Sequence, residues 1–299
     1  MTRLRRSELA VPASSEKMIR KAAQSAADLV FLDLEDAVAP AEKENARELA
    51  IRLLNELDWG QRVRAVRVND AHTRWAHDDV IEVLTGAGEQ LDVLILPKVK
   101  APRDVWFFET LVSQLEDKLG RAQPIGFEIL IEEAEALARV EELAGCSPRL
   151  EALILGFGDL AASLGFRFGH VENPADAYPG DPWHHARARV IAAARAQRLE
   201  AIDGPYPKIG DETGYRTEAT WASTLGMTGK WAIHPSQIEP ANQVFSPTEQ
   251  EVQVARQMCE AYESTDGAST AQGTLVDAAS ARMFGAVLHR AELIAKRPA

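Results

Sequence analysis

The chain of 299 residues is poor in cysteine, has no long apolar run and carries no excess of basic side chains. Its two cysteines, Cys146 and Cys259, form neither a CxxC pair nor a disulfide framework, which is typical of a reducing compartment. No apolar run approaches the roughly 20 residues that span a bilayer. The basic residues near the N-terminus precede no apolar segment of the kind that a secretory signal needs. The sequence therefore predicts a cytoplasmic protein without a membrane partner.

Acidic residues dominate the charge, since 45 Asp and Glu against 33 Lys and Arg give a formal net charge of −12. A uniformly acidic surface disfavours nucleic acid and anionic membranes as partners, because both carry dense negative charge. A small molecule that carries phosphate is not excluded, because it needs only a local cluster of cations. Lys17, Arg20 and Lys21 form such a cluster after the first predicted strand. The alternative is that they line a solvated helix face.

Short apolar runs rich in β-branched residues recur along the chain, with helical patterns between most of them. Eight such runs cover residues 9–12, 29–34, 63–68, 91–96, 125–132, 153–159, 199–202 and 231–233. Most are spaced by roughly 25–35 residues, which is the length of one β/α unit. Eight alternating units predict an α/β fold whose parallel sheet closes into a (β/α)₈ TIM barrel, here over residues 1–240.

Charged residues stand at the ends of these runs, where TIM barrels carry their active sites. Glu132 and Asp159 each close an apolar run, and a carboxylate in that position has left water with no partner in its own segment. Two such carboxylates on nearby strands can bind one hard cation such as Mg²⁺. The alternative is that each carboxylate caps the helix that follows.

Two further segments are predicted to lie over the same cleft. The insertion at 164–183 is rich in Gly and Pro and follows Asp159, so we expect a substrate loop there. Asp203, Gly204 and Pro205 follow the seventh run, and Gly and Pro allow a ligand to approach the backbone closely.

Residues 241–299 follow the predicted barrel and form a helical extension. Ser246, with proline next and Glu249 three residues later, predicts a helix start. A polar stretch over 263–273 is typical of a flexible loop, and a last helix is predicted over 278–295. This pattern predicts a lid over the barrel mouth, or an arm that reaches a neighbouring subunit. The alternative is a tail packed on the barrel wall.

Several motifs resemble those of the citrate lyase β-subunit-like superfamily. They are Arg6-Ser-Glu-Leu-Ala-Val-Pro-Ala-Ser14, Leu32-Asp-Leu-Glu-Asp-Ala-Val-Ala-Pro40, Val66-Arg-Val-Asn69, Ile95-Leu-Pro-Lys98 and Gly229-Lys-Trp-Ala-Ile-His-Pro235. More narrowly, three stretches are similar to the L-malyl-CoA/β-methylmalyl-CoA lyases, namely Asp181-Pro-Trp-His184, residues 225–237 and Gly273-Thr-Leu-Val-Asp-Ala-Ala-Ser280. The resemblance runs in order along nearly the whole chain, which makes it more specific than any single motif.

The resemblance implies a TIM barrel that uses Mg²⁺, with Mn²⁺ as an alternative. It also implies reversible carbon–carbon cleavage of malyl-CoA or β-methylmalyl-CoA to glyoxylate and acetyl-CoA or propionyl-CoA. Carried over by motif, Glu132 and Asp159 bind the metal and Arg67 stabilises the enolate oxygen. Asp277 exchanges the proton at the acyl carbon and in the family comes from an adjacent subunit. That arrangement implies a homo-oligomer, a trimer or a hexamer.

Supporting roles follow for residues around these four. Asp33, Glu35, Asp36 and Lys98 are predicted to orient Arg67 or the metal, and the cluster of Lys17, Arg20 and Lys21 is predicted to meet the CoA phosphates. Each role has a structural alternative. Arg67 can pair with Glu35 or Asp36, Asp36 with Lys98, and Asp277 can cap the last helix.

Other activities remain open at this point. A malyl-CoA thioesterase would use the same residues, and a citramalyl-CoA lyase would differ only in the size of its pocket. A citrate lyase β-like subunit that acts on an acyl-carrier protein is a third possibility. Against it stands the long extension with its own acid. Glu133, and the stretch Gln272-Gly-Thr-Leu-Val-Asp277, depart from the superfamily pattern and leave the acyl group open.

Overall fold

The structure, a computed structural model, describes residues 3–167, 180–264, 269–271 and 274–296. Its contacts divide the chain into two units. The barrel unit comprises residues 5–242, and the C-terminal unit comprises residues 243–299 together with 1–4. Most of the predicted substrate loop, residues 168–179, lies outside the described residues.

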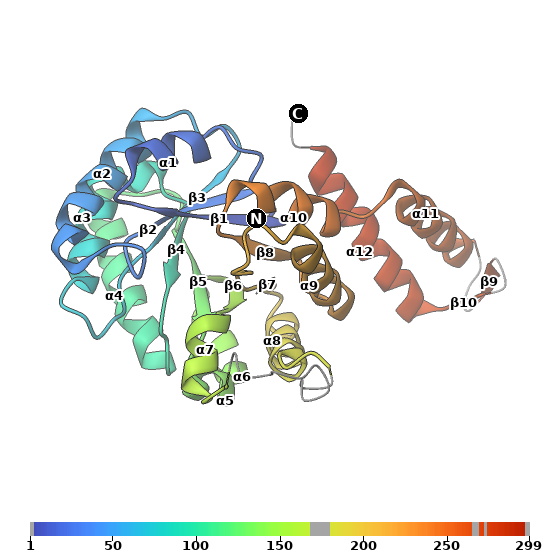
Figure 1. Ribbon diagram of the computed structural model, residues 1–299. Coiled ribbons are helices and arrows are strands. Elements are labelled where there is room, and N and C mark those ends of the chain that lie inside the picture. The colour runs from blue at the N-terminus through green and yellow to red at the C-terminus, as the bar shows by residue number, and fades with distance from the viewer. Residues whose placement is uncertain (1–2, 168–179, 265–268, 272–273, 297–299) are drawn as a thin grey trace. The chain divides into compact units, whose positions relative to one another are not determined.

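The strands β1 to β8 of the barrel unit pair in parallel and in sequence order, and β1 closes on β8 (Figure 1). This confirms the predicted (β/α)₈ barrel. The strands are β1 Ser7–Pro12, β2 Leu29–Asp33, β3 Val63–Arg67, β4 Val93–Leu96, β5 Gly126–Ile131, β6 Leu150–Leu155, β7 Glu200–Asp203 and β8 Gly229–Ala232.

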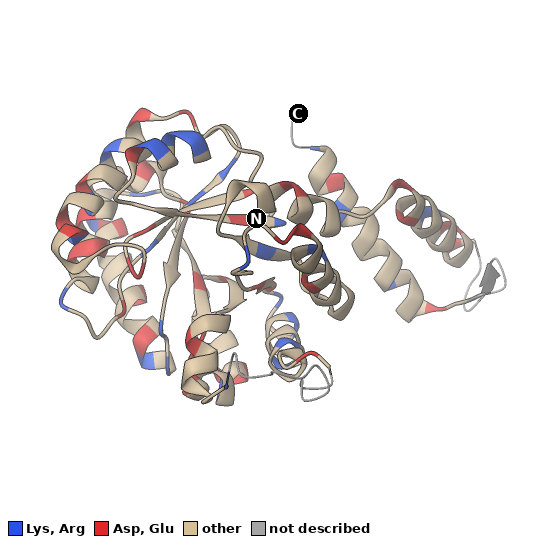
Figure 2. Ribbon diagram, in the orientation of Figure 1, with Lys and Arg blue, Asp and Glu red and all other residues tan. Residues whose placement is uncertain are grey.

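Helices follow the strands and lie outside them (Figure 1). They are α1 Glu16–Ala22, α2 Lys43–Glu56, α3 Ala76–Ala87, α4 Pro102–Leu119, α5 Ala134–Ala138, α6 Val140–Ala144, α7 Phe157–Ser163, α8 His184–Ala196, α9 Glu212–Leu225 and α10 Ile238–Val244. The short 3₁₀ turns among the described residues are η1 Pro40–Glu42, η2 Gly88–Gln90 and η4 Pro235–Gln237. Acidic residues are spread along outer helices such as α2 and α3, in keeping with the net charge (Figure 2).

Alternation along the strands decides which side chains fill the barrel. Residues two apart share a face, and one apolar cluster inside the barrel takes alternate positions such as Leu29 and Phe31 on β2. The same alternation carries Asp33 at the end of β2 and Arg67 at the end of β3 onto the inner face. Polar groups therefore continue the barrel interior at the carboxyl ends of the strands, which is where the predicted site lies.

The C-terminal unit contains α11 Glu249–Glu263, β9 Ser269–Ala271, β10 Thr274–Val276 and α12 Ala278–Ala295. The two strands pair antiparallel, so part of the stretch predicted as a loop is regular. The predicted helix start at Ser246 is wrong by two residues. Thr248 is the N-cap, because its hydroxyl accepts a hydrogen bond from the Glu251 N–H at 3.2 Å and the Glu251 carboxylate bonds back to the Thr248 N–H at 2.7 Å. Among the helices that the structure describes, none has both the length and the apolar content of a membrane span.

Candidate functional site

A cavity of about 440 Å³ opens over the carboxyl ends of the barrel strands. Charged groups form one part of its lining, with Asp33, Asp36, Arg67, Glu132 and Asp159 among them. Apolar side chains form the rest, namely Ala10, Val11, Pro12, Met18, Ala37, Leu130, Phe157, Pro205, Trp231 and Ile233, together with Gly156 and Gly158. The cavity thus joins a polar end, in which carboxylates outnumber the single guanidinium, to an apolar wall.

Arg67 is held from several sides at this polar end. Its Nε and Nη2 donate to the two oxygens of Asp33 at 2.7 and 2.6 Å, and its Nη1 lies 3.1 Å from Glu35 Oε2. Burial works against the charged form, but the carboxylates of Asp33 and Glu35 outweigh it and raise the pKa of Arg67 above its ordinary value. The guanidinium is therefore a permanent, oriented cation of the kind that stabilises a developing oxyanion.

Glu132 follows the last residue of β5 and is only 2% exposed. Burial raises the pKa of its carboxyl to about 8, and Glu35 and Asp159 add to the rise. The Lys98 backbone N–H, which donates to Glu132 Oε1 at 2.7 Å, and the charge of Arg67 oppose that rise without cancelling it. The ionised form of this buried carboxylate is thus left short of positive charge.

Asp159 does not end a strand as predicted. Strand β6 ends at Leu155, and Asp159 lies in the first turn of α7. Gly156 makes that turn, and a Cβ at this position would lie 2.6 Å from the Glu132 Cβ and 2.7 Å from its Oε2. Only glycine leaves room for the Glu132 carboxylate here, so the turn brings Asp159 to the cavity that Glu132 lines.

These residues fit a divalent cation. Two carboxylates line one cavity, and the charge of the buried one is not compensated by the protein. Within the described part of the chain, no group of three or more Asp, Glu, His or Cys side chains is placed to bind a metal. A site with only two protein carboxylates suits Mg²⁺, which keeps several water or substrate oxygens in its coordination shell.

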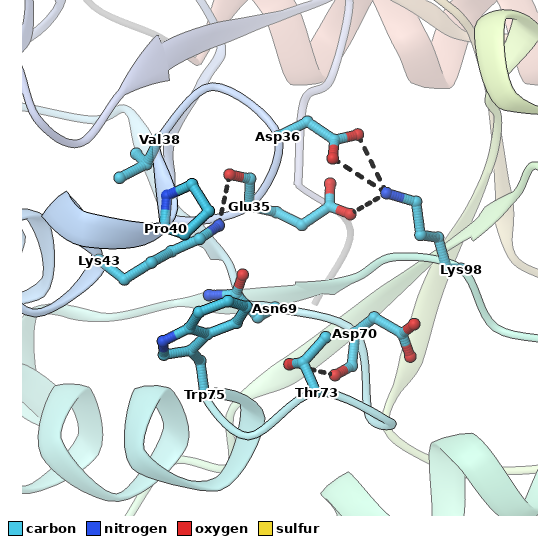
Figure 3. A pocket seen from close by; sticks show the side chains of 10 residues that line it. All are labelled: Glu35, Asp36, Val38, Pro40, Lys43, Asn69, Asp70, Thr73, Trp75 and Lys98. Carbon is cyan, nitrogen blue, oxygen red and sulfur yellow. Dashed lines mark hydrogen bonds and ion pairs between the residues drawn. The ribbon is translucent and has the colours of Figure 1, made fainter.

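Lys98 connects Glu132 to the acids that follow β2. Its Nζ contacts Glu35 and lies 3.0 Å from Asp36 Oδ1, as Figure 3 shows. The pairing of Asp36 with Lys98, the structural alternative to their predicted role, is thus observed. The Lys98 backbone is left-handed, with φ of +49°, a conformation that costs free energy in a residue other than glycine. That conformation accompanies the N–H bond to Glu132 and the opposite reach of the side chain toward Glu35.

The predicted CoA cluster does not line this cavity. Lys17, Arg20 and Lys21 are exposed on α1, and Arg20 pairs with Glu16 at 2.6 Å. The side chain of α1 that does reach the cavity is Met18. A contact between the cluster and phosphates stays a prediction.

The prediction that Asp203 lines the cleft is wrong. It is fully buried and takes the face of β7 opposite to Ile202, so it points to the helices and not to the cavity. There it accepts from Arg187 Nε at 2.9 Å and from Lys230 Nζ at 2.6 Å. Gly204 packs under Leu155 and Phe157, and Pro205 alone of the predicted trio lines the cavity.

Asp277 caps α12 in the C-terminal unit. Its Oδ1 accepts from the N–H groups of Ala279 and Ser280 at 3.0 and 2.9 Å and from the Ser280 hydroxyl at 2.9 Å. These bonds, those from Ser280 first, hold the pKa of the carboxyl below its ordinary value. The capping alternative is thus observed, and the proton-transfer role stays a prediction.

Sequence reasoning did not identify Met18, Phe157 and Trp231 as part of the cavity. A signal was present for Trp231, because it belongs to the eighth apolar run, and TIM barrels carry their active sites at the ends of such runs. Met18 carries no comparable signal, because a residue in the first helix reaches the cavity only through the barrel's tertiary packing.

The chain is similar to known proteins in sequence and in fold. The model of the HpcH/HpaI aldolase/citrate lyase family matches residues 6–235. The L-malyl-CoA/beta-methylmalyl-CoA lyase of Cereibacter sphaeroides is 41% identical, over 97% of this chain and 95% of the relative. The (3S)-malyl-CoA thioesterase of the same species is 35% identical over 97% and 95%. The solved structure of CitE from Mycobacterium tuberculosis with magnesium, acetoacetate and coenzyme A has a TM-score of 0.74 at 29% identity, covering 96% of this chain and 97% of that one.

Proposed function

Because the chain belongs to the HpcH/HpaI aldolase/citrate lyase family, we propose that it is a Mg²⁺-dependent carbon–carbon lyase that reversibly cleaves malyl-CoA or β-methylmalyl-CoA. The products are glyoxylate and acetyl-CoA or propionyl-CoA. The observation that carries the proposal is a buried, undercompensated carboxylate, Glu132, in one cavity with an oriented guanidinium, Arg67. The 41% identity to a lyase of this specificity supports it.

Cleavage moves the electron pair of the broken carbon–carbon bond onto the acyl fragment, where it is shared with the thioester oxygen as an enolate. Arg67 has five N–H donors, and two of them bond the carboxylate of Asp33, whereas its Nη1 forms an ion pair with Glu35 Oε2 at 3.1 Å. The three N–H groups that do not bond Asp33 can meet the enolate oxygen, whose charge is larger in the transition state than in the substrate. Arg67 therefore lowers the barrier and does more than bind the thioester.

Glu132 and Asp159 would bind Mg²⁺, which supplies Lewis-acid chemistry and a template for the keto-acid end of the substrate. Mn²⁺ accepts similar oxygen ligands and is the expected substitute. The Lys98 N–H keeps Glu132 oriented whether or not the carboxyl is charged. Glu35 and Asp36 balance the Lys98 ammonium, so that this cation does not compete with the metal for Glu132.

The proton balance needs one more group. The hydroxyl of the malyl unit loses its proton as the keto acid forms, and the enolate carbon gains one as the acyl-CoA forms. Asp277 is proposed to serve that carbon, with residues 241–299 as a lid from a neighbouring subunit of a homo-oligomer. Its second oxygen, Oδ2, accepts no hydrogen bond from the residues that the structure describes, so it can meet substrate while Oδ1 caps α12. We further propose a cytoplasmic location, in line with the cysteine content.

The test is incubation of the purified protein with malyl-CoA and Mg²⁺, with and without EDTA, while glyoxylate and free CoA thiol are measured separately. A lyase yields glyoxylate without free thiol, and EDTA abolishes the reaction. Glu132→Gln is the matched variant, because it keeps the shape and the Lys98 bond but loses the charge that binds the metal. The proposal is refuted if neither glyoxylate nor free CoA thiol forms from malyl-CoA or from β-methylmalyl-CoA.

A thioesterase is the second candidate, favoured by the 35% identity to a malyl-CoA thioesterase over nearly the whole chain. In that reaction water attacks the thioester and Arg67 stabilises the same oxygen. Free thiol and malate without glyoxylate would identify it in the same assay.

A further inference from the structure

Trp231 lies between the catalytic arginine and a carboxyl buried inside the barrel. The Arg67 guanidinium carbon lies 5.5 Å from the centre of the indole ring. The indole Nε1 donates to Glu8 Oε2 at 2.9 Å. Glu8 is on β1, directly opposite Trp231 on β8 where the barrel closes. A continuous line of contacts thus runs from the barrel interior to the cavity.

The contacts of Arg67 divide its surface. Asp33 accepts hydrogen bonds from Nε and Nη2 along one edge, Glu35 Oε2 lies 3.1 Å from Nη1 as an ion pair, and the indole ring of Trp231 lies against the guanidinium. A guanidinium held only by its edge can still swing about that edge. An aromatic ring within about 6 Å attracts the cation and blocks that swing.

The ring itself is fixed. Trp231 is 5% exposed and its indole packs on Phe31 with ring centres 4.6 Å apart. The single polar anchor of the indole is Glu8, which is fully buried. Burial and the neighbouring Glu128 carboxylate raise the pKa of Glu8 well above its ordinary value. Two groups offset part of this cost, because Arg5 Nε lies 3.9 Å from Glu8 Oε1 and the indole N–H donates to Oε2.

We propose that Trp231, anchored by Glu8, is a positioning residue that holds the Arg67 guanidinium with its remaining N–H groups toward the reacting oxygen. The kinetic part of this inference rests on the proposed function. Trp231 acts through Arg67, and Glu8 acts through Trp231.

A double-mutant cycle tests whether Trp231 acts through Arg67. Trp231→Leu removes the ring and is expected to lower kcat about tenfold, with little change in KM. In an Arg67→Gln background the same change should cause no further loss, because no cation remains to position. Equal losses in both backgrounds, or a loss confined to KM, would overturn the proposal. Trp221→Leu on α9 is the control, since that tryptophan is 49% exposed.

Conservative variants test whether Glu8 anchors Trp231, and they can refute the proposal even if Trp231→Leu does not fold. Glu8→Gln keeps an acceptor for the indole N–H and should stay within about twofold of the wild-type kcat. Trp231→Phe keeps a ring but loses the N–H, and is expected to lose several-fold in kcat. A wild-type kcat in Trp231→Phe, or a loss in Glu8→Gln as large as in Trp231→Leu, would remove the anchor from the argument.

A measurement without substrate separates this inference from the proposed function. The Arg67 Nε–H signal in ¹⁵N spectra, assigned by its absence in Arg67→Gln, should carry a ring-current shift that disappears in Trp231→Leu. A wild-type protein without lyase activity refutes the proposed function, and the signal then decides the positioning alone. No change of the signal in Trp231→Leu refutes the positioning, whatever the activity.

Discussion

Replacement of Glu132 by glutamine is expected to make the metal-free protein more stable while it abolishes metal-dependent activity. The carboxyl of Glu132 has a pKa of about 8 in the folded protein, against an ordinary value of 4.5. At 1.36 kcal/mol per pH unit, that rise corresponds to about 5 kcal/mol of destabilisation when the group is ionised. Glutamine has no charge to desolvate and keeps an oxygen for the Lys98 N–H.

The sign of the pH dependence follows from proton binding. The folded state holds this proton more tightly than the unfolded chain does, so the wild-type protein loses stability as pH rises from about 4.5 to about 8. At pH 5 the carboxyl is protonated in the folded state, and the wild type and Glu132→Gln should melt within a few degrees of each other. At pH 9 in EDTA the variant should melt about 10–20 °C higher than the wild type, because the difference in free energy of unfolding is about 5 kcal/mol.

Thermal melts at pH 5, 7 and 9, with EDTA or with millimolar Mg²⁺, measure this difference. Mg²⁺ binds the ionised wild-type site and should narrow the gap at pH 9, but should leave Glu132→Gln unchanged. Glu133→Gln is the matched control, because its half-buried carboxylate should change the melting temperature by only about 2 °C at any pH. A gap that does not grow with pH, or a variant less stable than the wild type at pH 9, would show that the reasoning is wrong.

Three further predictions concern the other groups of the site. Arg67→Lys loses the paired bonds to Asp33 and should lower kcat about 10²–10³-fold in steady-state kinetics. Arg64 lies on the opposite face of β3 and pairs with Asp92, so Arg64→Lys is the control and should leave kcat unchanged. Gly156→Ala puts a Cβ 2.7 Å from Glu132 Oε2 and should weaken Mg²⁺ binding in calorimetry, while Gly158→Ala, with open space at its Cβ, should leave it unchanged. Asp277→Asn should keep the melting temperature, because asparagine caps a helix as well, but should lower kcat at least 10²-fold; retained turnover would remove Asp277 from the mechanism.

The sequence alone determined the barrel. Eight apolar runs at the spacing of β/α units identified every strand of the sheet, because strands buried on both faces need continuous apolar residues. It also singled out Glu132, since a carboxylate that ends such a run has no partner nearby in the chain. Both inferences rest on local pattern, which the sequence displays directly.

Local pattern was less reliable at the edges of elements. The apolar run to Asp159 was read as one strand, although Gly156 ends the strand and starts a helix. Asp203 was assigned to the cleft, although alternation with Ile202 turns it to the helices. The sequence shows that alternate residues of a strand share a face, but which set faces the barrel interior is certain only when one inward residue is known.

Only the tertiary structure decided which charges meet. Asp33 and Arg67 come together because β2 and β3 pair with those two residues in register. Glu8 and Trp231 lie 223 positions apart in the chain and meet only because β1 closes on β8. Partner choice between buried charges depends on register and closure, which are properties of the whole sheet, and no local stretch of sequence contains them.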